Sequence, residues 1–387
     1  MGKSNVACKS ECKKILIKGY YGFGNLGDDI LMMTSYSFLK EKYPDATYYV
    51  FSNNDDEVFR QYIYKLLNKE VLIIDWKSQE NFDIIWRGGG GVFFDFKTGK
   101  LKDLIINLSI KLMGIYSYKT LFNLYKKLTK QKNISTKRQL GIGIGLGKHT
   151  LSSRKFRDHC IELANFNALI VRDSISISYL KKLKFKKFYS QRTDLAFFCN
   201  AWEQRSLKSN NGVFHNKIGF VLRDWNYEDI TAEDNIFQVA LQLQEKGIQT
   251  SFFSFDESGD AHVIEKAKQL NFIVYVWNPN NISLSDYLEY LALNSLLITA
   301  RAHGAIIGNC LQIPSICLAI EPKLVQVHQM LSISTELINP PFLNEELLHS
   351  VNKIILSYQS YFEATLVDFY KNKQMINKGF DEISNFF

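Results

Sequence analysis

The chain has 387 residues, of which 46% are hydrophobic and 22% are charged, and its formal net charge is +8. This composition excludes a disordered chain, and the length predicts two domains of about 150–200 residues each. The first residues are polar, and no apolar run reaches about 18 residues, so neither a signal peptide nor a membrane-spanning helix is expected.

The sequence contains six scattered cysteines, of which only Cys8 and Cys12 are closely spaced. This pair has no second pair and no nearby histidine to complete a zinc site, so no metal site is predicted. Scattered, unpaired cysteines are typical of a reducing compartment, which favours a cytoplasmic protein.

Short apolar runs alternate with helical patterns along the chain. In the first half, strands are predicted over 14–21, 46–52, 71–76, 82–91, 139–147 and 168–173, with helices over 30–43 and from 174. The polar segment 200–212 is predicted to be a linker. The alternation then restarts, with strands over 217–223, 249–255, 272–277, 295–301 and 314–320 and helices between them.

This alternation predicts the α/β class, with two Rossmann-like domains that face each other across a cleft, as in the GT-B architecture. We expect an N-terminal domain over 1–200 and a C-terminal domain over 213–387. In such sheets a ligand binds at the carboxyl ends of the strands, and therefore in the cleft.

The segment 97–138 is strongly basic, with eleven Lys and Arg residues against one acid, Asp103. Its lysines alternate with Leu, Ile, Tyr and Phe at helical spacing. This pattern fits a basic amphipathic helix on an anionic membrane surface, or a core-packed helix with a solvated lysine face. No nucleic-acid-binding motif accompanies the segment, so nucleic acid is not expected as a partner.

The loop "GYYGFGNLGDD" (19–29) contains Gly-x-Gly-x-x-Gly between a predicted strand and a predicted helix, where a dinucleotide fingerprint occurs. Two observations oppose a nucleotide. Asp28 and Asp29 lie where a phosphate would bind, and the strand-end acid that would hold a ribose is missing. The two aspartates either compensate the helix dipole or bind sugar hydroxyls. We therefore predict that Gly24, Asn25 and these aspartates form the acceptor side of the cleft.

Two further strand ends carry glycines beside a polar side chain. Arg87 precedes four glycines, and it either binds an anion or pairs with an acid. His149 ends "GIGIGLGKH", where it is a candidate acceptor contact or a surface histidine. A third strand end carries Arg172 and Asp173, for which an internal salt bridge is favoured.

The strand end "ITARAHGAIIGN" (298–309) has the strongest functional pattern. Arg301, His303 and Gly304 bring a guanidinium, an imidazole and helix N–H groups to one place, which predicts an anion site with an acid/base beside it. Arg223 ends the first strand of the same domain, and Lys323 follows a later strand. We predict His303 as the acid/base, and Arg301, Arg223, Lys323 and Gly304 as the donor-binding groups.

The chain resembles the polysaccharide pyruvyl transferase family through blocks in the family's order. These blocks are "GYYGFGNLGDDILMMTSY", "RGGGGVF", "GIGIGLG", "VRDSISISYL", "RTDLAFF", "GFVLRDW" and "LLITARAHGAIIGNCLQIPSICLAIEPK". The sequence differs from the family pattern in its Asp-Asp pair, where Asp-Glu is common, in Lys148 near an expected proline, and in the segment 97–138.

The resemblance implies a GT-B-like fold and transfer of a pyruvyl group from phosphoenolpyruvate to two hydroxyls of a sugar, which gives a cyclic ketal and phosphate. Phosphoenolpyruvate is then a co-substrate, and no cofactor is expected. The acceptor is expected to be a cell-surface polysaccharide or its lipid-linked precursor. A lipid-linked acceptor would place the protein on the inner face of the membrane.

Three other functions remain open from the residues alone. A GT-B glycosyltransferase that uses a nucleotide-sugar would need a ribose-binding acid, for which Glu321 is the candidate. An NAD-dependent oxidoreductase is disfavoured by Asp28 and Asp29. A non-enzymatic sugar-binding protein is disfavoured because it would not need the anion-binding group Arg301 or the acid/base His303.

Overall fold

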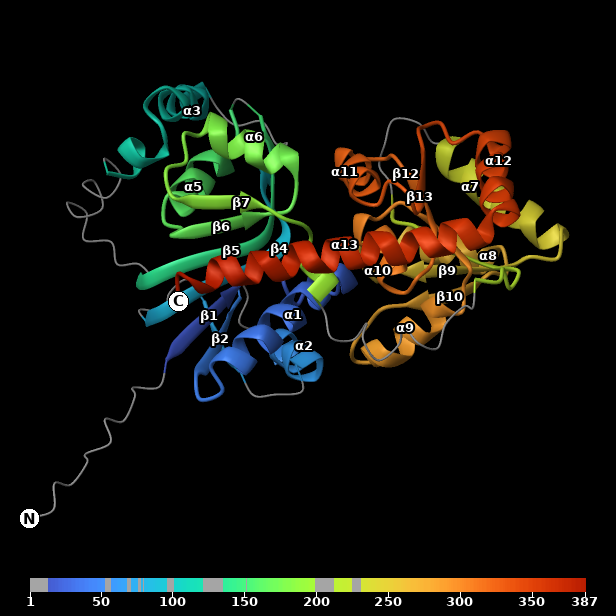
Figure 1. Ribbon diagram of the computed structural model, residues 1–387, viewed down its shortest axis with the longest axis horizontal. Helices are drawn as coiled ribbons and strands as arrows, with labels where there is room; N and C mark the ends of the chain where they lie inside the picture. The colour runs from blue at the N-terminus through green and yellow to red at the C-terminus, as the bar shows by residue number, and fades with distance from the viewer. Residues whose placement is uncertain are drawn as a thin grey trace, which may run out of the picture.

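Two β-sheets, each built of parallel strands, form the framework of the protein (Figure 1). The computed structural model describes residues 13–52, 57–67, 71–75, 78, 80–95, 101–120, 135–150, 152–198, 212–224 and 231–387. The predicted linker 200–212 lies outside these ranges except for Gly212, and so do parts of the basic segment 97–138.

The first sheet has seven strands in the order β3-β2-β1-β4-β5-β6-β7, all paired in parallel. The strands are β1 (Lys14–Lys18), β2 (Thr47–Phe51), β3 (Leu72–Ile74), β4 (Asn81–Asp95), β5 (Ser135–His149), β6 (Ala168–Val171) and β7 (Phe188–Gln191). The helices of this unit include α1 (Leu26–Lys42), α2 (Glu57–Leu67), α3 (Leu101–Met113), α5 (Arg154–Leu163) and α6 (Ser174–Lys182), and the 3₁₀ turn η1 (Leu195–Phe198) follows.

The second sheet has six parallel strands in the order β10-β9-β8-β11-β12-β13. They are β8 (Lys217–Val221), β9 (Gln249–Ser254), β10 (Ile273–Val276), β11 (Leu296–Thr299), β12 (Ser315–Leu318) and β13 (Thr335–Ile338). The helices are α7 (Thr231–Glu245), α8 (Ala261–Gln269), α9 (Leu284–Ala292), α10 (Ala302–Cys310), α11 (Pro322–Met330), α12 (Asn344–Leu356) and α13 (Tyr358–Ser384). The sequence patterns predicted neither β13 nor β7 of the first sheet.

Both sheets have the strand order of a doubly wound fold, so the prediction of two Rossmann-like units is confirmed. Strands β6, β11 and β12, none of which is an edge strand, are buried at every residue. Continuous apolar runs of this kind are characteristic of parallel strands that helices cover on both faces. The predicted strands correspond to observed ones, and their bounds differ by a few residues.

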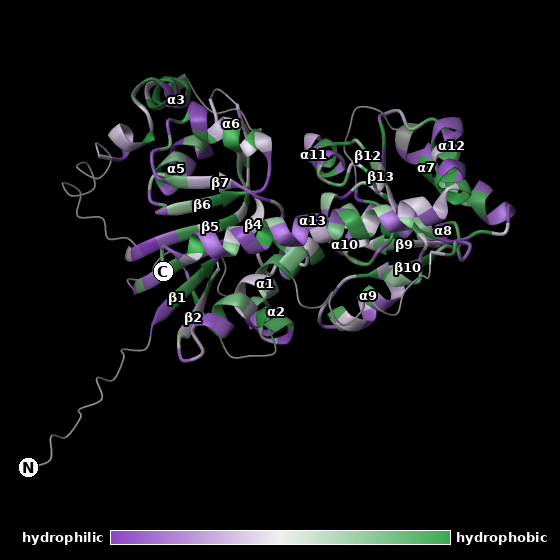
Figure 2. Cartoon of the chain, in the orientation of Figure 1, coloured by the Kyte–Doolittle hydropathy of each residue, from purple (hydrophilic) through white to green (hydrophobic). Residues whose placement is uncertain are grey.

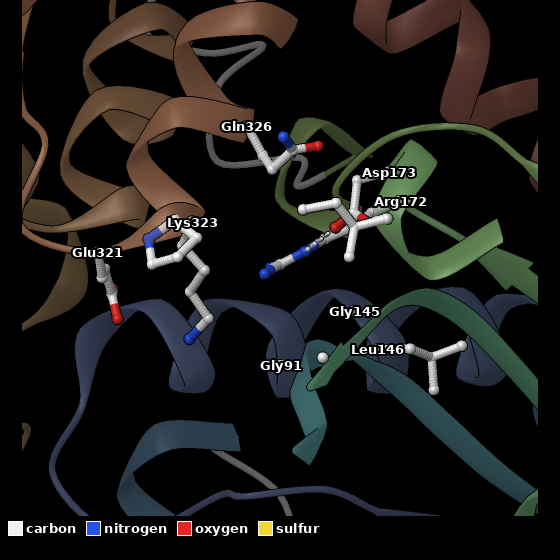
Figure 3. A pocket seen from close by; sticks show the side chains of 11 residues that line it. Gly91, Gly145, Leu146, Arg172, Asp173, Glu321, Lys323 and Gln326 are labelled. Atoms are coloured by element: carbon white, nitrogen blue, oxygen red, sulfur yellow. Dashed lines mark hydrogen bonds and ion pairs between the residues drawn. The ribbon is translucent and has the colours of Figure 1, made fainter. Parts of the chain in front are cut away.

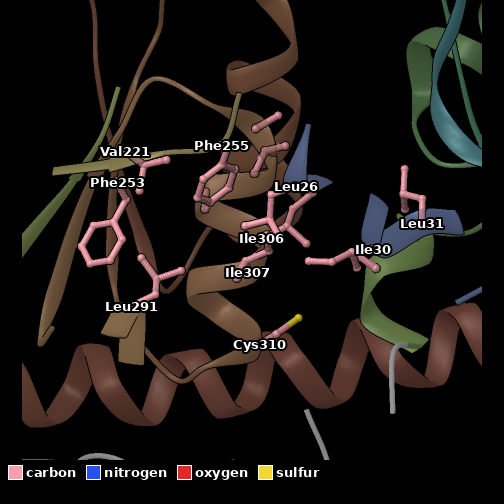
Figure 4. Close-up of a cluster of buried hydrophobic side chains, with 14 of the residues drawn as sticks. Leu26, Ile30, Leu31, Val221, Phe253, Phe255, Leu291, Ile306, Ile307 and Cys310 are labelled. Carbon is pink, nitrogen blue, oxygen red and sulfur yellow. The ribbon is translucent and has the colours of Figure 1, made fainter. Parts of the chain in front are cut away.

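One hydrophobic core continues from the first unit into the second. Leu26 and Ile30 of α1 lie beside Ile306 and Ile307 of α10 (Figure 4). All four side chains are buried. Helices α1 and α10 therefore pack against each other at the junction between the two sheets.

The last helix, α13, runs from the second unit back across the first (Figure 1). Near its beginning, Thr365 O accepts a hydrogen bond from Asn309 at 3.2 Å. Near its end, Phe380 stacks on Trp86 of β4 at 6.3 Å between ring centroids, and Glu382 pairs with Arg192. Hydrophobic and hydrophilic residues alternate along the helix (Figure 2). The helix therefore packs on both units.

In the parts of the chain that the structure describes, no helix is long and apolar enough to cross a membrane.

Candidate active site

A cavity of about 400 Å³ lies between the two units and is lined by residues from both. Its charged lining consists of five basic residues, three acidic residues and one histidine: Lys155, Arg172, Arg223, Arg301, Lys323, Asp28, Asp256, Glu321 and His303. The excess of cations makes the cavity suited to a small, multiply charged anion.

Six of the predicted site residues line this cavity: Asn25, Asp28, Arg223, Arg301, His303 and Lys323. They come from the N-cap and first turn of α1 in the N-terminal unit and from the segments that follow the carboxyl ends of β8, β11 and β12. Parallel strands place these ends at one edge of each sheet, and the junction brings the two edges together.

The loop before α1 is held against the second unit by its backbone. Asn25 caps α1, and its Oδ1 accepts a hydrogen bond from Gly27 N at 3.1 Å. Leu26 N donates to Phe255 O at 2.9 Å, and Asn25 pairs with Asp256 in an isolated antiparallel bridge. The Gly-x-Gly-x-x-Gly turn therefore joins the two units.

His303 lies in the first turn of α10, with its Nε2 3.8 Å from Asp194 Oδ1. Asp194 is completely buried and also accepts hydrogen bonds from Arg172 Nη1 at 3.0 Å and from Ala196 N at 3.0 Å. Burial opposes ionisation of this carboxyl, but His303, Arg172 and the Ala196 N–H outweigh it, so the pKa of Asp194 lies well below its usual range. A buried carboxylate therefore faces the imidazole.

The opposite side of the His303 ring rests on Gly27. A Cβ at Gly27 would lie 2.0 Å from His303 Nδ1, well inside van der Waals contact. The last glycine of the opening motif therefore makes room for an imidazole from the other unit.

Arg301 precedes α10 and is fixed by two contacts. Its Nη2 forms an ion pair with the buried carboxylate of Asp260, and its Nε donates to Leu222 O at 3.4 Å. Burial raises the pKa of Asp260, and Arg301 opposes this rise. Arg301 is thus held in one orientation at the cavity wall, with its remaining N–H groups available to an anion.

Arg223 and Lys323 complete the cationic side. Arg223 Nη1 lies 3.6 Å from Glu321 Oε1. Burial lowers the pKa of the Lys323 ammonium, whereas the charges of Glu321 and Asp28 oppose this fall. Asp28 is half-buried, and burial raises its pKa against the influence of His303 and Lys323.

A second cavity of about 310 Å³ adjoins the first and shares Gly91, Arg172, Glu321 and Lys323 with it. Lys323 and Arg172 extend into it from opposite sides (Figure 3). Arg172 Nε pairs with Asp173 Oδ2 at 3.4 Å, which confirms the predicted internal salt bridge, although Asp194 is the nearer partner.

Asp29 does not line the cavity. Its Oδ2 accepts hydrogen bonds from the Tyr62 hydroxyl and from Trp277 Nε1, the latter at 2.9 Å. Burial raises the pKa of Asp29 to about 7, while the two hydrogen bonds oppose the rise. Because Trp277 belongs to the second unit, Asp29 is a buried link between the units and not a group that faces a ligand.

Arg87 and His149 also lie away from the cavity lining. Arg87 is buried and pairs with Glu162 at 2.5 Å, so pairing with an acid is the alternative observed. His149 Nδ1 lies 2.6 Å from the Tyr179 hydroxyl, and its Nε2 lies 2.7 Å from His159 Nδ1. Both side chains hold elements of the first unit together.

The two predicted glycines do not line the cavity either. Gly304 packs on β11, where a Cβ would lie 2.1 Å from Thr299 Oγ1, and its N–H donates to Arg301 O at 2.9 Å. That N–H is therefore already used within the turn. Gly24 has a φ of +80° and open space around its Cα, so it allows the turn without contacting the site.

Sequence patterns missed several residues of the site. Asp194 and Asp260 act through partners far away in sequence. Asp194 lies in the family block "RTDLAFF", which was the available signal for it. Tyr20 lines the cavity, is 59% exposed and stacks on Phe23 at 4.4 Å between ring centroids. Exposed neighbouring aromatic residues in a glycine loop were the available signal for it.

Comparison with known proteins identifies the family. The family profile described as polysaccharide pyruvyl transferase matches residues 25–322, which begin at the N-cap of α1 and include the start of α10. The chain belongs to the polysaccharide pyruvyl transferase family. The resemblance inferred from the sequence blocks is thereby confirmed, and the family implies a polysaccharide acceptor.

Solved structures show the GT-B fold of this pyruvyl transferase. The UDP-GlcNAc 2-epimerase of Methanocaldococcus jannaschii, in complex with UDP-GlcNAc and UDP, has a TM-score of 0.52 at 11% identity and covers 88% of this chain and 92% of its own. Anabaena HepE in complex with UDP has a TM-score of 0.53 at 10% identity, over 96% and 99% of the two chains. Medicago truncatula UGT71G1 with UDP-glucose has a TM-score of 0.50 at 8% identity, over 96% and 98%. A search of curated protein sequences found no match.

Proposed function

We propose that this pyruvyl transferase takes its pyruvyl group from phosphoenolpyruvate and joins it to two hydroxyls of one sugar as a cyclic ketal, with release of phosphate. The observation that carries the proposal is the convergence of Arg223, Arg301, Lys323 and His303 on one cavity. Phosphoenolpyruvate has a phosphate and a carboxylate on neighbouring positions, and both require cationic partners.

The chemistry requires one protonation and two oxygen–carbon bonds. The enol CH₂ carbon takes a proton and becomes a methyl group, which leaves an oxocarbenium-like centre on the adjacent carbon. A sugar hydroxyl attacks this centre and loses its proton. A second hydroxyl then displaces phosphate, which departs with the proton of that hydroxyl, and the new oxygen–carbon bond closes the ketal ring. The site must therefore move protons and stabilise negative charge on the departing phosphate.

His303 is the proposed proton-transfer group. It lines the cavity, and its Nε2 faces the buried carboxylate of Asp194 at 3.8 Å. A carboxylate beside an imidazole orients the ring. Asp194 is accordingly a positioning residue, and Gly27 limits the ring from the other side.

Arg301 and Arg223 are the proposed anion-binding groups of the donor site. Asp260 holds Arg301 in place, which lowers the entropy that the guanidinium loses on binding. Arg223 pairs with Glu321 only at 3.6 Å and is partly exposed, so it can turn toward an arriving anion. Lys323 adds a third cation from the wall shared with the second cavity.

The acceptor sugar is proposed to bind on the N-terminal side of the cavity, as the sequence predicted for Asn25 and Asp28. Both line the cavity from the first unit, and carboxylate and amide oxygens accept hydrogen bonds from hydroxyls. The stacked pair of Tyr20 and Phe23 provides an exposed apolar surface beside them. The acceptor class is a cell-surface glycan or its lipid-linked precursor.

The decisive test is phosphate release from phosphoenolpyruvate in the presence of acceptor glycosides. His303→Ala should reduce kcat by about 10²-fold or more, which is the usual contribution of a general acid/base. Arg223→Ala should raise the KM for phosphoenolpyruvate with a smaller change in kcat. His349→Ala, on an exposed face of α12, is the matched control and should retain wild-type activity. Activity of His303→Ala within a few-fold of wild type would refute the assignment.

The alternative of a nucleotide-sugar glycosyltransferase makes a different prediction for ligand binding. Its ribose would need Glu321, which faces Arg223 in the present structure. Thermal unfolding with phosphoenolpyruvate and with a panel of nucleotide-sugars separates the two functions. Stabilisation by a nucleotide-sugar alone would favour the alternative.

A further inference from the structure

The helix α3 leaves an apolar stripe uncovered. Ile105, Leu108 and Leu112 are 60%, 44% and 77% exposed, and their spacing places them on one face of the helix. The opposite face packs on the first unit, where Ile110 is fully buried and Asn107 Nδ2 donates to Ser153 O at 2.9 Å. The helix lies at the outer edge of the molecule and is largely hydrophobic (Figure 2).

A lysine-rich segment from another part of the chain lies beside this stripe. The segment 181–187, "KKLKFKK", contains five lysines and no acid, and all five lysines are exposed. Lys184 Nζ donates to Leu112 O at 3.2 Å, and Lys186 N donates to the Tyr116 hydroxyl at 3.2 Å. Apolar and cationic groups that are about 70 residues apart in sequence therefore lie beside each other.

We propose that the stripe of α3 and the lysines of 181–187 together form a surface that docks on an anionic lipid membrane. We call it the docking surface. Leucine and isoleucine side chains enter the boundary between headgroups and acyl chains, while the lysines remain at the level of the anionic headgroups. A nucleic acid would use the lysines but leave the apolar stripe exposed to water.

The docking surface and the cavities are connected by α6. The C-terminal end of this helix carries Lys181 and Lys182, and Ile175 near its N-terminal end lines the second cavity. The nine residues of the helix span about 13 Å at 1.5 Å per residue. Docking would thus hold the second cavity about 13 Å, the length of α6, from the docking surface. That docking would bring the cavity close to a lipid-linked acceptor rests on the proposed function. Docking on the membrane does not rest on it.

The test is cosedimentation of the full chain with phosphatidylcholine vesicles that either contain or lack phosphatidylglycerol, at low and at high salt. We expect binding to the anionic vesicles at low salt, much less at high salt, and much less to neutral vesicles. Leu108→Glu with Leu112→Glu should weaken binding at least tenfold, and so should Lys181→Glu with Lys182→Glu.

Matched control variants separate the docking surface from exposure or charge in general. Leu356→Glu changes an 87% exposed leucine on α12, at the other end of the molecule from α3 (Figure 1). Lys246→Glu with Lys268→Glu changes two exposed lysines of the second unit. Both controls should bind as wild type does, and all variants should keep the wild-type thermal transition.

Absence of wild-type binding to anionic vesicles at low salt would overturn the proposal, and so would equal loss in docking-surface and control variants. Binding to neutral vesicles as strong as to anionic ones would remove the role of the lysines. Retained phosphate release on a soluble acceptor in the docking-surface variants separates failure of docking from failure of the proposed reaction.

Discussion

Gly27 of the first unit and His303 of the second are in contact across the junction, so that a Cβ at Gly27 would lie 2.0 Å from His303 Nδ1. Gly27 is the last glycine of the dinucleotide-like pattern in the opening loop. Its missing side chain therefore makes room for an imidazole and not for a pyrophosphate. Glycine is required at position 27 for steric reasons, because the His303 ring occupies the space that any side chain there would need.

Gly27→Ala should therefore displace the His303 ring and reduce kcat by about 10²-fold, the effect expected for a displacement of about 1 Å at a catalytic group. Gly24→Ala is the control within the same loop. Its Cβ meets open space, but φ is +80°, so it should cost about 1 kcal/mol of stability with little change in kcat. Steady-state kinetics and urea unfolding of both variants measure the contrast; similar kcat values in the two would argue against the steric account.

Asp194→Asn should lower kcat by about 10²-fold while the KM for phosphoenolpyruvate stays close to wild type, because Asp194 faces His303 and does not line the cavity. Asp173→Asn is the matched control, since Asp173 pairs with the same arginine, Arg172, through Nε, whereas Asp194 pairs with its Nη1. Either change leaves Arg172 with one carboxylate fewer. A kcat loss of the same size in Asp173→Asn would assign the effect to Arg172 and not to the imidazole.

Asp29 should make the protein less stable as the pH rises toward neutrality. Its folded-state pKa is raised to about 7, so the native chain holds this proton more tightly than the unfolded chain does. Stability from the protonated form is fully present below the unfolded pKa of about 3.9, and it is lost as the pH rises through about 7. Asp29→Asn should remove this contribution to the pH dependence, and urea unfolding between pH 5 and pH 8 measures it.

An exposed carboxylate provides the comparison for that series. Asp381→Asn, on the solvent face of α13, should leave the pH dependence as in wild type. The difference in free energy of unfolding between Asp29→Asn and wild type should grow in favour of the variant up to about pH 7 and then level off. A difference that does not change with pH would exclude the titration of Asp29.

Tyr20→Ala should raise the KM for the acceptor by about fivefold to tenfold, which corresponds to about 1–1.5 kcal/mol for the loss of an aromatic contact surface. Tyr20→Phe should retain most of the affinity because the ring remains. Tyr370→Ala removes a similarly exposed tyrosine, 58% against 59%, from α13 and serves as the control. Unchanged acceptor KM in Tyr20→Ala would place the sugar elsewhere in the cavity.

Local patterns predicted the fold class well because each pattern depends on neighbouring residues. Apolar runs such as those of β6 and β11 indicate buried parallel strands wherever they occur. Arg301 and His303 were likewise predictable, since they stand at the end of a strand and the start of a helix, and parallel topology sends such positions to one edge of the sheet.

The same reasoning could not distinguish polar residues at strand ends that face the cleft from those that face another element. Arg87, His149 and Asp29 all belong to glycine-rich segments at strand ends. Their polar groups nevertheless bind other side chains and not the cleft, and the partners are Glu162, Tyr179 and Trp277. These partners lie between 30 and 248 residues away in sequence. A buried charge must find a partner, and which partner is near depends on how the helices pack.

The amino-acid sequence by itself determined the two Rossmann-like units, the family and the cations at the carboxyl ends of the second sheet, because these follow from local periodicity and short motifs. The tertiary structure decided which of those groups meet. It placed Gly27 against His303, buried Asp194 behind the imidazole and set the lysines of 181–187 beside α3. Contacts between segments far apart in the chain depend on how the two sheets and their helices pack, which no local pattern specifies.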